Sequence, residues 1–112
     1  MKIYLASRFR NKEKIRVLKS ELNCCGHQAL CSWLDENPAN TKEENARRDL
    51  QEIDEADALL LFTEDCELVP GGMHVEFGYA LAKGKKLFLL GPPVNIFNYL
   101  SEVVILKSLN DI

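Results

Sequence analysis

The sequence predicts a single α/β domain in which helices cover both faces of a five-stranded parallel sheet. The chain has 112 residues, which is the size of one domain. Short apolar segments that suit buried strands alternate along it with longer segments whose apolar residues have helical spacing. Strands and helices that alternate in this way form parallel sheets, because each crossover helix packs back on the sheet. We therefore expect one three-layer α/β/α domain over residues 1–112, with the flavodoxin-like strand order 2-1-3-4-5.

The first half of the chain contains three predicted strands and two predicted helices. Each helix segment has apolar residues on one face and charges on the others, as in a helix that covers a sheet. Gly26 is a natural end for the first helix, and Pro38 marks a loop before the second. In chain order the elements are a strand at Lys2–Ala6, a helix at Asn11–Cys24, a strand at His27–Leu34, a loop at Asp35–Thr41, a helix at Lys42–Glu55 and a strand at Ala58–Phe62.

The second half repeats the alternation with shorter connections. Gly84 is expected to end its helix, and Gly91-Pro92-Pro93 interrupts the chain after a further strand. The elements are a polar loop at Thr63–Pro70, a helix at Gly72–Lys83, a strand at Lys86–Leu90, a helical turn at Asn95–Leu100 and a last strand at Val103–Leu106.

Composition and charge argue against several classes of protein. The chain carries 14 basic and 17 acidic residues, a net charge of −3, and no basic stripe that would suit a nucleic acid polymer. It has no apolar run near the roughly 20 residues that span a bilayer, and its first residues become charged too early for a signal peptide. We therefore expect a cytoplasmic protein that contacts no membrane.

The four cysteines do not predict a metal site. Zinc sites usually contain pairs of ligands separated by two residues, and this chain has no such pair. The cysteines are Cys24, Cys25, Cys31 and Cys66. We expect reduced and mostly packed thiols, with no metal bound.

Polar and aromatic residues follow the first predicted strand, and Trp33 lies near the end of the second. Ligands of open parallel sheets bind beyond the carboxyl ends of the strands, here at the switch point between the first and third strands. Ser7, Arg8 and Arg10 could form an anion site there with backbone N–H groups, although a solvated loop is the equal alternative. Phe9 and Trp33 could each stack on a base, but Trp33 suits the core equally well.

Glu76 is the candidate nucleophile. Gly71 and Gly72 precede it and permit a close approach of a ligand to the backbone. Glu76 then falls in the first or second helical turn, where the helix dipole favours the ionised form that can attack a sugar carbon. The structural alternative is that Glu is common at helix starts and that His74, a possible acid or base, is an ordinary surface histidine. The hydroxyl of Tyr4 could reach the same site from the first strand.

Four segments of the chain resemble the nucleoside 2-deoxyribosyltransferase family, which includes relatives that hydrolyse deoxynucleoside 5′-monophosphates. The most specific segment is GGMHVEFGYALAKGK at Gly71–Lys85. The others are KIYLASRFR, NARRDLQEIDEADALLLFTE and GPPVNIFNYL. They occur in the order typical of the family and cover nearly the full length.

The resemblance implies roles that the residues alone do not establish. Glu76 matches the nucleophile of the family, and Tyr4 matches a tyrosine that holds it. Asp49, which by itself suits a solvated helix face, matches an aspartate that handles the base or shares its proton. Ser7 and Arg10 are the nearest equivalents of the residues that bind a 5′-phosphate in the nucleotide hydrolases. Gly72, Phe9, Trp33 and His74 complete the set of candidate substrate-binding residues.

The resemblance also implies the partners and the chemistry. We expect a small-molecule nucleoside or nucleotide as substrate, no cofactor, and at least a homodimer whose sites are shared between subunits. Hydrolysis and transfer of the sugar to a second base both stay open. A nucleotide-binding or sequestering module without turnover is the alternative from another class, and a flavin-binding role follows from fold analogy alone.

Overall fold

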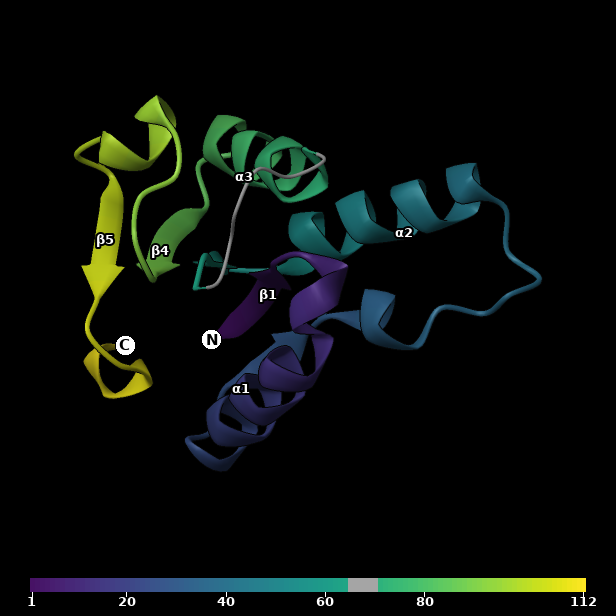
Figure 1. The fold of residues 1–112 in the computed structure, drawn as a ribbon, viewed down its shortest axis with the longest axis horizontal. Coiled ribbons are helices and arrows are strands. Elements are labelled where there is room, and N and C mark those ends of the chain that lie inside the picture. The colour runs from purple at the N-terminus through teal and green to yellow at the C-terminus, as the bar shows by residue number, and fades with distance from the viewer. Residues whose placement is uncertain (65–70) are drawn as a thin grey trace.

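The computed structural model describes residues 1–64 and 71–112, in which strands and helices alternate as expected (Figure 1). Its strands are β1 (Lys2–Ala6), β2 (Gln28–Leu30), β3 (Ala58–Phe62), β4 (Lys86–Leu90) and β5 (Val103–Leu106). Its α-helices are α1 (Lys12–Cys24), α2 (Lys42–Glu55) and α3 (Gly72–Ala82). Short 3₁₀ helices lie at Phe9–Asn11, Ser32–Asp35, Ile96–Tyr99 and Leu109–Asp111. Most of the loop predicted over 63–70 lies outside the described residues.

The five strands form one parallel sheet with the predicted order β2-β1-β3-β4-β5. Helices α2 and α3 lie on one side of this sheet and α1 lies on the other (Figure 1). The predicted three-layer α/β/α architecture is therefore confirmed. No helix in the two described ranges is long and apolar enough to cross a membrane.

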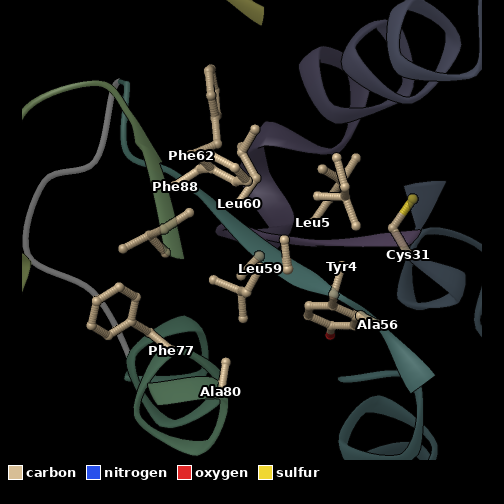
Figure 2. Packing of buried hydrophobic residues seen from close by; sticks show 14 of the residues in the cluster. Tyr4, Leu5, Cys31, Ala56, Leu59, Leu60, Phe62, Phe77, Ala80 and Phe88 are labelled. Atoms are coloured by element: carbon tan, nitrogen blue, oxygen red, sulfur yellow. The ribbon is translucent and has the colours of Figure 1, made fainter. Parts of the chain in front are cut away.

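Alternation along the central strands decides which side chains face which layer. Tyr4 of β1 is paired in register with Leu59 of β3, and both point toward the layer that contains Phe77 of α3 (Figure 2). Leu5 and Leu60 come next in each strand and point to the opposite side (Figure 2). The strand pattern that buries the core therefore also directs the hydroxyl of Tyr4 toward α2 and α3.

A capping box fixes the start of α2. The backbone N–H of Glu44 donates to Oγ1 of Thr41 at 3.1 Å, and the backbone N–H of Thr41 donates to Oε1 of Glu44 at 2.8 Å. Two donors that the helix leaves unpaired are satisfied in this way. Because the start of the helix sets which residues face α3, this cap also determines where Asp49 lies.

The second strand is shorter than predicted. The sequence predicts this strand at His27–Leu34, but it covers Gln28–Leu30 and is followed by the 3₁₀ helix Ser32–Asp35. The side chain of Trp33 in this turn is 7% exposed, and its Nε1 donates to the carbonyl oxygen of Leu5 at 2.8 Å. The apolar residues that resembled a longer strand therefore pack a turn against the sheet.

The cysteines differ partly from expectation. Cys31 is buried, but Cys24 and Cys25 are exposed, and all three are free thiols. The prediction of packed thiols is therefore wrong for Cys24 and Cys25, which lie at the end of α1. Cys66 lies outside the described residues.

Candidate active site

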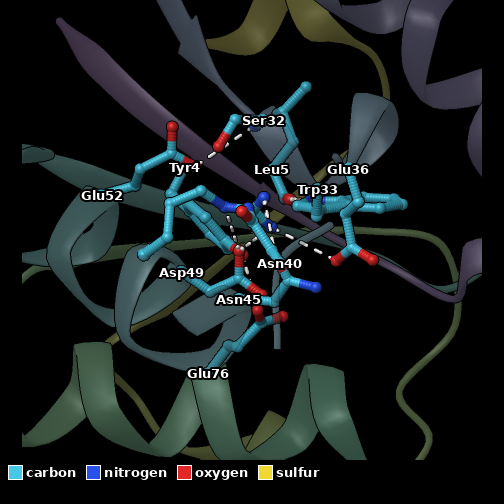
Figure 3. A network of polar contacts seen from close by, with 11 residues as sticks. Tyr4, Leu5, Ser32, Trp33, Glu36, Asn40, Asn45, Asp49, Glu52 and Glu76 are labelled. Atoms are coloured by element: carbon cyan, nitrogen blue, oxygen red, sulfur yellow. Dashed lines mark hydrogen bonds and ion pairs between the residues drawn. The ribbon is translucent and has the colours of Figure 1, made fainter. Parts of the chain in front are cut away.

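Three side chains from three different elements meet between β1, α2 and α3 (Figure 3). The hydroxyl of Tyr4 donates to Oε2 of Glu76 at 2.5 Å. Asp49 and Glu76 both line a cavity of about 250 Å³ between α2 and α3. The structure therefore brings together the three residues that were named as catalytic candidates.

The helical period explains why these residues share one cavity. Residues three and four positions apart lie on the same face of a helix. Both helices contribute this spacing to the cavity, Ala46, Asp49 and Leu50 from α2 and Gly72, Val75 and Glu76 from α3. The predicted substrate-binding residue Gly72 therefore lies in the wall of the cavity, where an added Cβ would meet no atom within 4 Å.

Burial dominates the electrostatics of Glu76. It raises the pKa of this carboxyl to about 7, and the nearby carboxylates of Asp49 and Glu52 act in the same direction. The hydrogen bond from Tyr4 and the charge of Arg48 oppose the rise. The helix dipole was expected to favour the ionised form, but Glu76 is the fifth residue of α3 and lies beyond the first turn, where the dipole acts most strongly, so burial sets the direction of the pKa shift.

Asp49 is held by the residue that precedes it. Nη2 and Nε of Arg48 donate to Oδ1 of Asp49 at 2.9 and 3.3 Å. Burial raises the pKa of Asp49, and the guanidinium of Arg48 opposes that rise. Nη2 of Arg48 also donates to Oε1 of Glu36, which comes from the loop before α2, at 3.2 Å. Arg48 and Glu36 could not be singled out from the sequence, because no spacing pattern distinguishes them from other surface charges.

The residues that follow β1 do not line this cavity. The hydroxyl of Ser7 donates to the carbonyl oxygen of Phe62 at 3.0 Å, and Arg10 is exposed. Phe9 is 60% exposed and its ring centroid lies 6.5 Å from that of the buried Trp33. The anion site at Ser7 and Arg10 and the stacking role of either aromatic residue stay predictions, with Phe9 the more accessible of the two rings.

His74 faces a second cavity. Nδ1 of His74 lies 3.0 Å from Nδ2 of Asn95, whose Oδ1 accepts from the backbone N–H of Phe97 at 2.9 Å. The amide nitrogen donates, so the proton of the neutral imidazole is on Nε2. Both His74 and Asn95 line an apolar cavity of about 430 Å³. A role for His74 in substrate binding stays a prediction. Among the described residues, no cluster of His, Cys, Asp or Glu is arranged to hold a metal ion.

Replacing Tyr4 by Phe is expected to raise the pKa of Glu76 above its value of about 7. The substitution removes a hydroxyl that donates to the carboxylate and so favours its charged form. The measurement is a pH titration of the Glu76 side-chain carbon by NMR in both proteins. An unchanged or lower midpoint in the Phe variant would contradict this account of the Tyr4 hydrogen bond.

No family model and no curated protein matches the sequence. Among solved structures, the chain is similar to the CMP N-glycosidase of Clostridium botulinum, with 24% identity over 96% of this chain and 91% of that chain and a TM-score of 0.68. It is also similar to a 2-deoxyribosyltransferase from the psychrotolerant bacterium Bacillus psychrosaccharolyticus, with 27% identity over 99% of this chain and 89% of that chain and a TM-score of 0.72. The likeness to the N-glycosidase shows that the two chains share a fold. The likeness to the 2-deoxyribosyltransferase has a higher sequence identity and covers almost the whole of this chain. Over almost its whole length the chain is therefore similar to nucleoside 2-deoxyribosyltransferase-like enzymes.

Proposed function

We propose that this enzyme cleaves the N-glycosidic bond of a nucleoside or its 5′-monophosphate, with Glu76 as the nucleophile. The observation that carries the proposal is that Asp49 and Glu76 line one cavity while the hydroxyl of Tyr4 donates to Glu76. The names of the two structural neighbours agree with it, since one is an N-glycosidase of CMP and the other transfers a 2-deoxyribosyl group. A cytoplasmic location is part of the same proposal.

The hydrogen bonds of Glu76 suit a nucleophilic role. Tyr4 engages Oε2, and Oε1 has no hydrogen-bond partner among the described residues. In the proposed first step, Oε1 attacks the anomeric carbon from the face opposite the base and forms a glycosyl ester. The bonding electrons leave with the base, and the carboxyl of Asp49 donates or shares the proton that the base takes up.

The second step decides between hydrolysis and transfer. Water that attacks the glycosyl ester gives a proton to the carboxylate of Asp49 and releases the sugar or its 5-phosphate, whereas a second base that attacks the ester forms a new nucleoside or nucleotide. In both cases two successive displacements occur at the anomeric carbon, and the second one regenerates Glu76 as a carboxylate. A second acceptor therefore needs only to reach the same carbon once the first base has left.

A chromatographic scan tests the proposal. Purified protein is incubated with a panel of nucleosides and 5′-monophosphates, with and without an added free base. Free base released from a panel member would support glycosidic cleavage, and a new nucleoside that forms only with added base would assign transfer. Binding measured by calorimetry without any product would contradict the proposal and favour the nucleotide-binding module.

We also propose that the enzyme is at least a homodimer with shared sites. The second cavity lies beside exposed apolar side chains from α3 and the 3₁₀ helix Ile96–Tyr99, namely Val75, Ile96, Phe97 and Tyr99. Val75 lines both this cavity and the one that contains Glu76. A second copy bound at this apolar surface would therefore border on the candidate active site, and exposed patches of this kind mark interaction sites.

Replacing Phe97 by Asp is expected to convert the dimer into a monomer, because the charge would have to be buried in an apolar contact. Light scattering after size-exclusion chromatography measures the mass of each species. The matched control is Val17→Asp, since Val17 is similarly exposed but lies on α1, at the opposite side of the sheet. A wild-type protein that is monomeric, or a dimeric Phe97→Asp variant, would contradict the proposed interface.

A further inference from the structure

The guanidinium of Arg48 is engaged almost completely within the protein. Nε and Nη2 donate to Oδ1 of Asp49, and Nη2 also donates to Glu36. Nη1 lies 3.5 Å from Oδ1 of Asn45, which accepts in turn from Nδ2 of Asn40 at 3.3 Å. A guanidinium has five N–H groups, and four of them are accounted for by these contacts. Arg48 is therefore committed mainly to protein groups.

The contacts of Arg48 divide the two oxygens of Asp49. Both go to Oδ1, while Oδ2 has no hydrogen-bond partner among the described residues. Glu76 is held in the same way, because the hydroxyl of Tyr4 donates to Oε2 and not to Oε1. Each carboxyl of the cavity is thus anchored by one oxygen, so that its other oxygen is available to a molecule bound between them.

We propose that Arg48 is a positioning residue that anchors Asp49 through Oδ1, so that Oδ2 is presented to the departing base. Glu36 and Asn45 hold Arg48 in the required orientation from the loop before α2 and from the preceding turn of α2. This inference rests on the proposed function, because it assigns Oδ2 of Asp49 to the proton transfer in glycosidic cleavage. It adds a residue that acts through Asp49 and does not itself touch the substrate.

The surroundings of Asp49 show why this contact matters. Apart from Arg48, the charged groups that act on it are the carboxylates of Glu36 and Glu52. The pair Tyr4 and Glu76 faces it from β1 and α3. Without the guanidinium, Asp49 would be surrounded by acidic groups and a phenol, would keep its proton to higher pH and would lose the donor that orients it. The raised pKa of Asp49 and the loss of its orienting donor would both affect the same proton transfer. An experiment must therefore distinguish the effect of the Arg48 charge from the effect of its hydrogen-bond geometry.

Two substitutions make that separation. Arg48→Met removes the charge and the donors, whereas Arg48→Lys keeps a charge but cannot present two N–H groups in a fixed fork. The matched control is Arg47→Met, because Arg47 is the neighbouring residue on α2, is largely exposed and, within the described ranges, pairs only with Glu43 at 3.4 Å. We measure kcat and KM for base release from the substrate found in the nucleotide panel. We also follow the Asp49 side-chain carbon by NMR as a function of pH.

Arg48→Met is expected to lower kcat by about 10- to 100-fold with little change in KM, as for a displaced catalytic group. It is also expected to raise the midpoint of the Asp49 titration. Arg48→Lys should restore most of that midpoint but only part of kcat, and Arg47→Met should match the wild type in both. Thermal unfolding of each variant shows that the fold is retained.

Three results would overturn the inference. The first is a wild-type kcat in Arg48→Met. The second is a full recovery of kcat in Arg48→Lys, which would show that the charge alone is sufficient. The third is an Asp49 titration midpoint that is the same in the wild type and in Arg48→Met. A failure of the proposed function is distinguishable, because it would appear as no base release by the wild type or as full activity after replacement of Glu76. The NMR titration reports on the contact between Arg48 and Asp49 whether or not a substrate has been found.

Discussion

Replacing Glu76 by Gln is expected to lower the rate of base release by about 10³-fold or more, which corresponds to roughly 4 kcal/mol of transition-state stabilisation. An amide of nearly the same size cannot form the glycosyl ester, so the two-step route is lost. The amide oxygen can still accept the hydrogen bond from Tyr4 that Oε2 of Glu76 accepts in the wild type. Because the contact is retained, the loss of rate would report on chemistry and not on folding. Chromatography of the released base measures it.

Glu55→Gln is the matched control for this experiment. Glu55 ends α2, is exposed, and accepts a hydrogen bond only from Gln51, among the described residues. The same chemical change there is expected to leave the rate at the wild-type value. If Glu76→Gln kept a rate within a few-fold of the wild type, the covalent mechanism would be wrong, whatever the substrate is.

The same Glu76→Gln substitution is expected to stabilise the folded protein at pH 8 but not at pH 4. Burial holds the pKa of Glu76 at about 7 in the folded state, above its ordinary value of 4.5. A carboxyl whose pKa is raised on folding contributes stability below the unfolded value and loses it as the pH rises through the folded value. Gln does not titrate, so it avoids this loss. The expected gain at pH 8 is on the order of 1 to 3 kcal/mol.

Urea unfolding at pH 4 and pH 8 measures this difference. The wild type should lose stability relative to the Gln variant between about pH 4.5 and pH 7, the two pKa values that bound the effect. Glu55→Gln again provides the control, and it should follow the wild type at both pH values. A Gln variant that is less stable than the wild type at pH 8, or equally stabilised at both, would show that the burial of Glu76 does not perturb its ionisation.

Most of the fold could be predicted because its signals are local. The apolar run Ala58–Phe62 identifies the central strand, and all five of its residues are buried. Gly26 and Gly84 mark the ends of two helices and have positive φ angles of 87° and 71°. The second strand was predicted too long because the hydrogen bond between Trp33 and Leu5, which fixes the turn after it, joins residues far apart in the chain.

The candidate site could be predicted only in part, and for a related reason. Glu76 follows from its place at the start of a helix, whereas Asp49 was singled out only by resemblance to a family. The upward shift of the Glu76 pKa could not be predicted, because it depends on burial between three elements and not on its own helix. Arg48 and Glu36 have no recognisable spacing, and their contact with Asp49 exists only once the loop before α2 is folded.

The most direct test of Glu76 as the nucleophile is the stereochemistry of the first product. When methanol competes with water during cleavage of a β-nucleotide, NMR of the resulting methyl glycoside reports the configuration of its anomeric carbon. Two successive displacements through a glycosyl ester on Glu76 retain configuration, whereas direct attack by solvent with Glu76 as a general base inverts it. We predict the β-methyl glycoside. The α-methyl glycoside as the first product would contradict the nucleophilic role of Glu76.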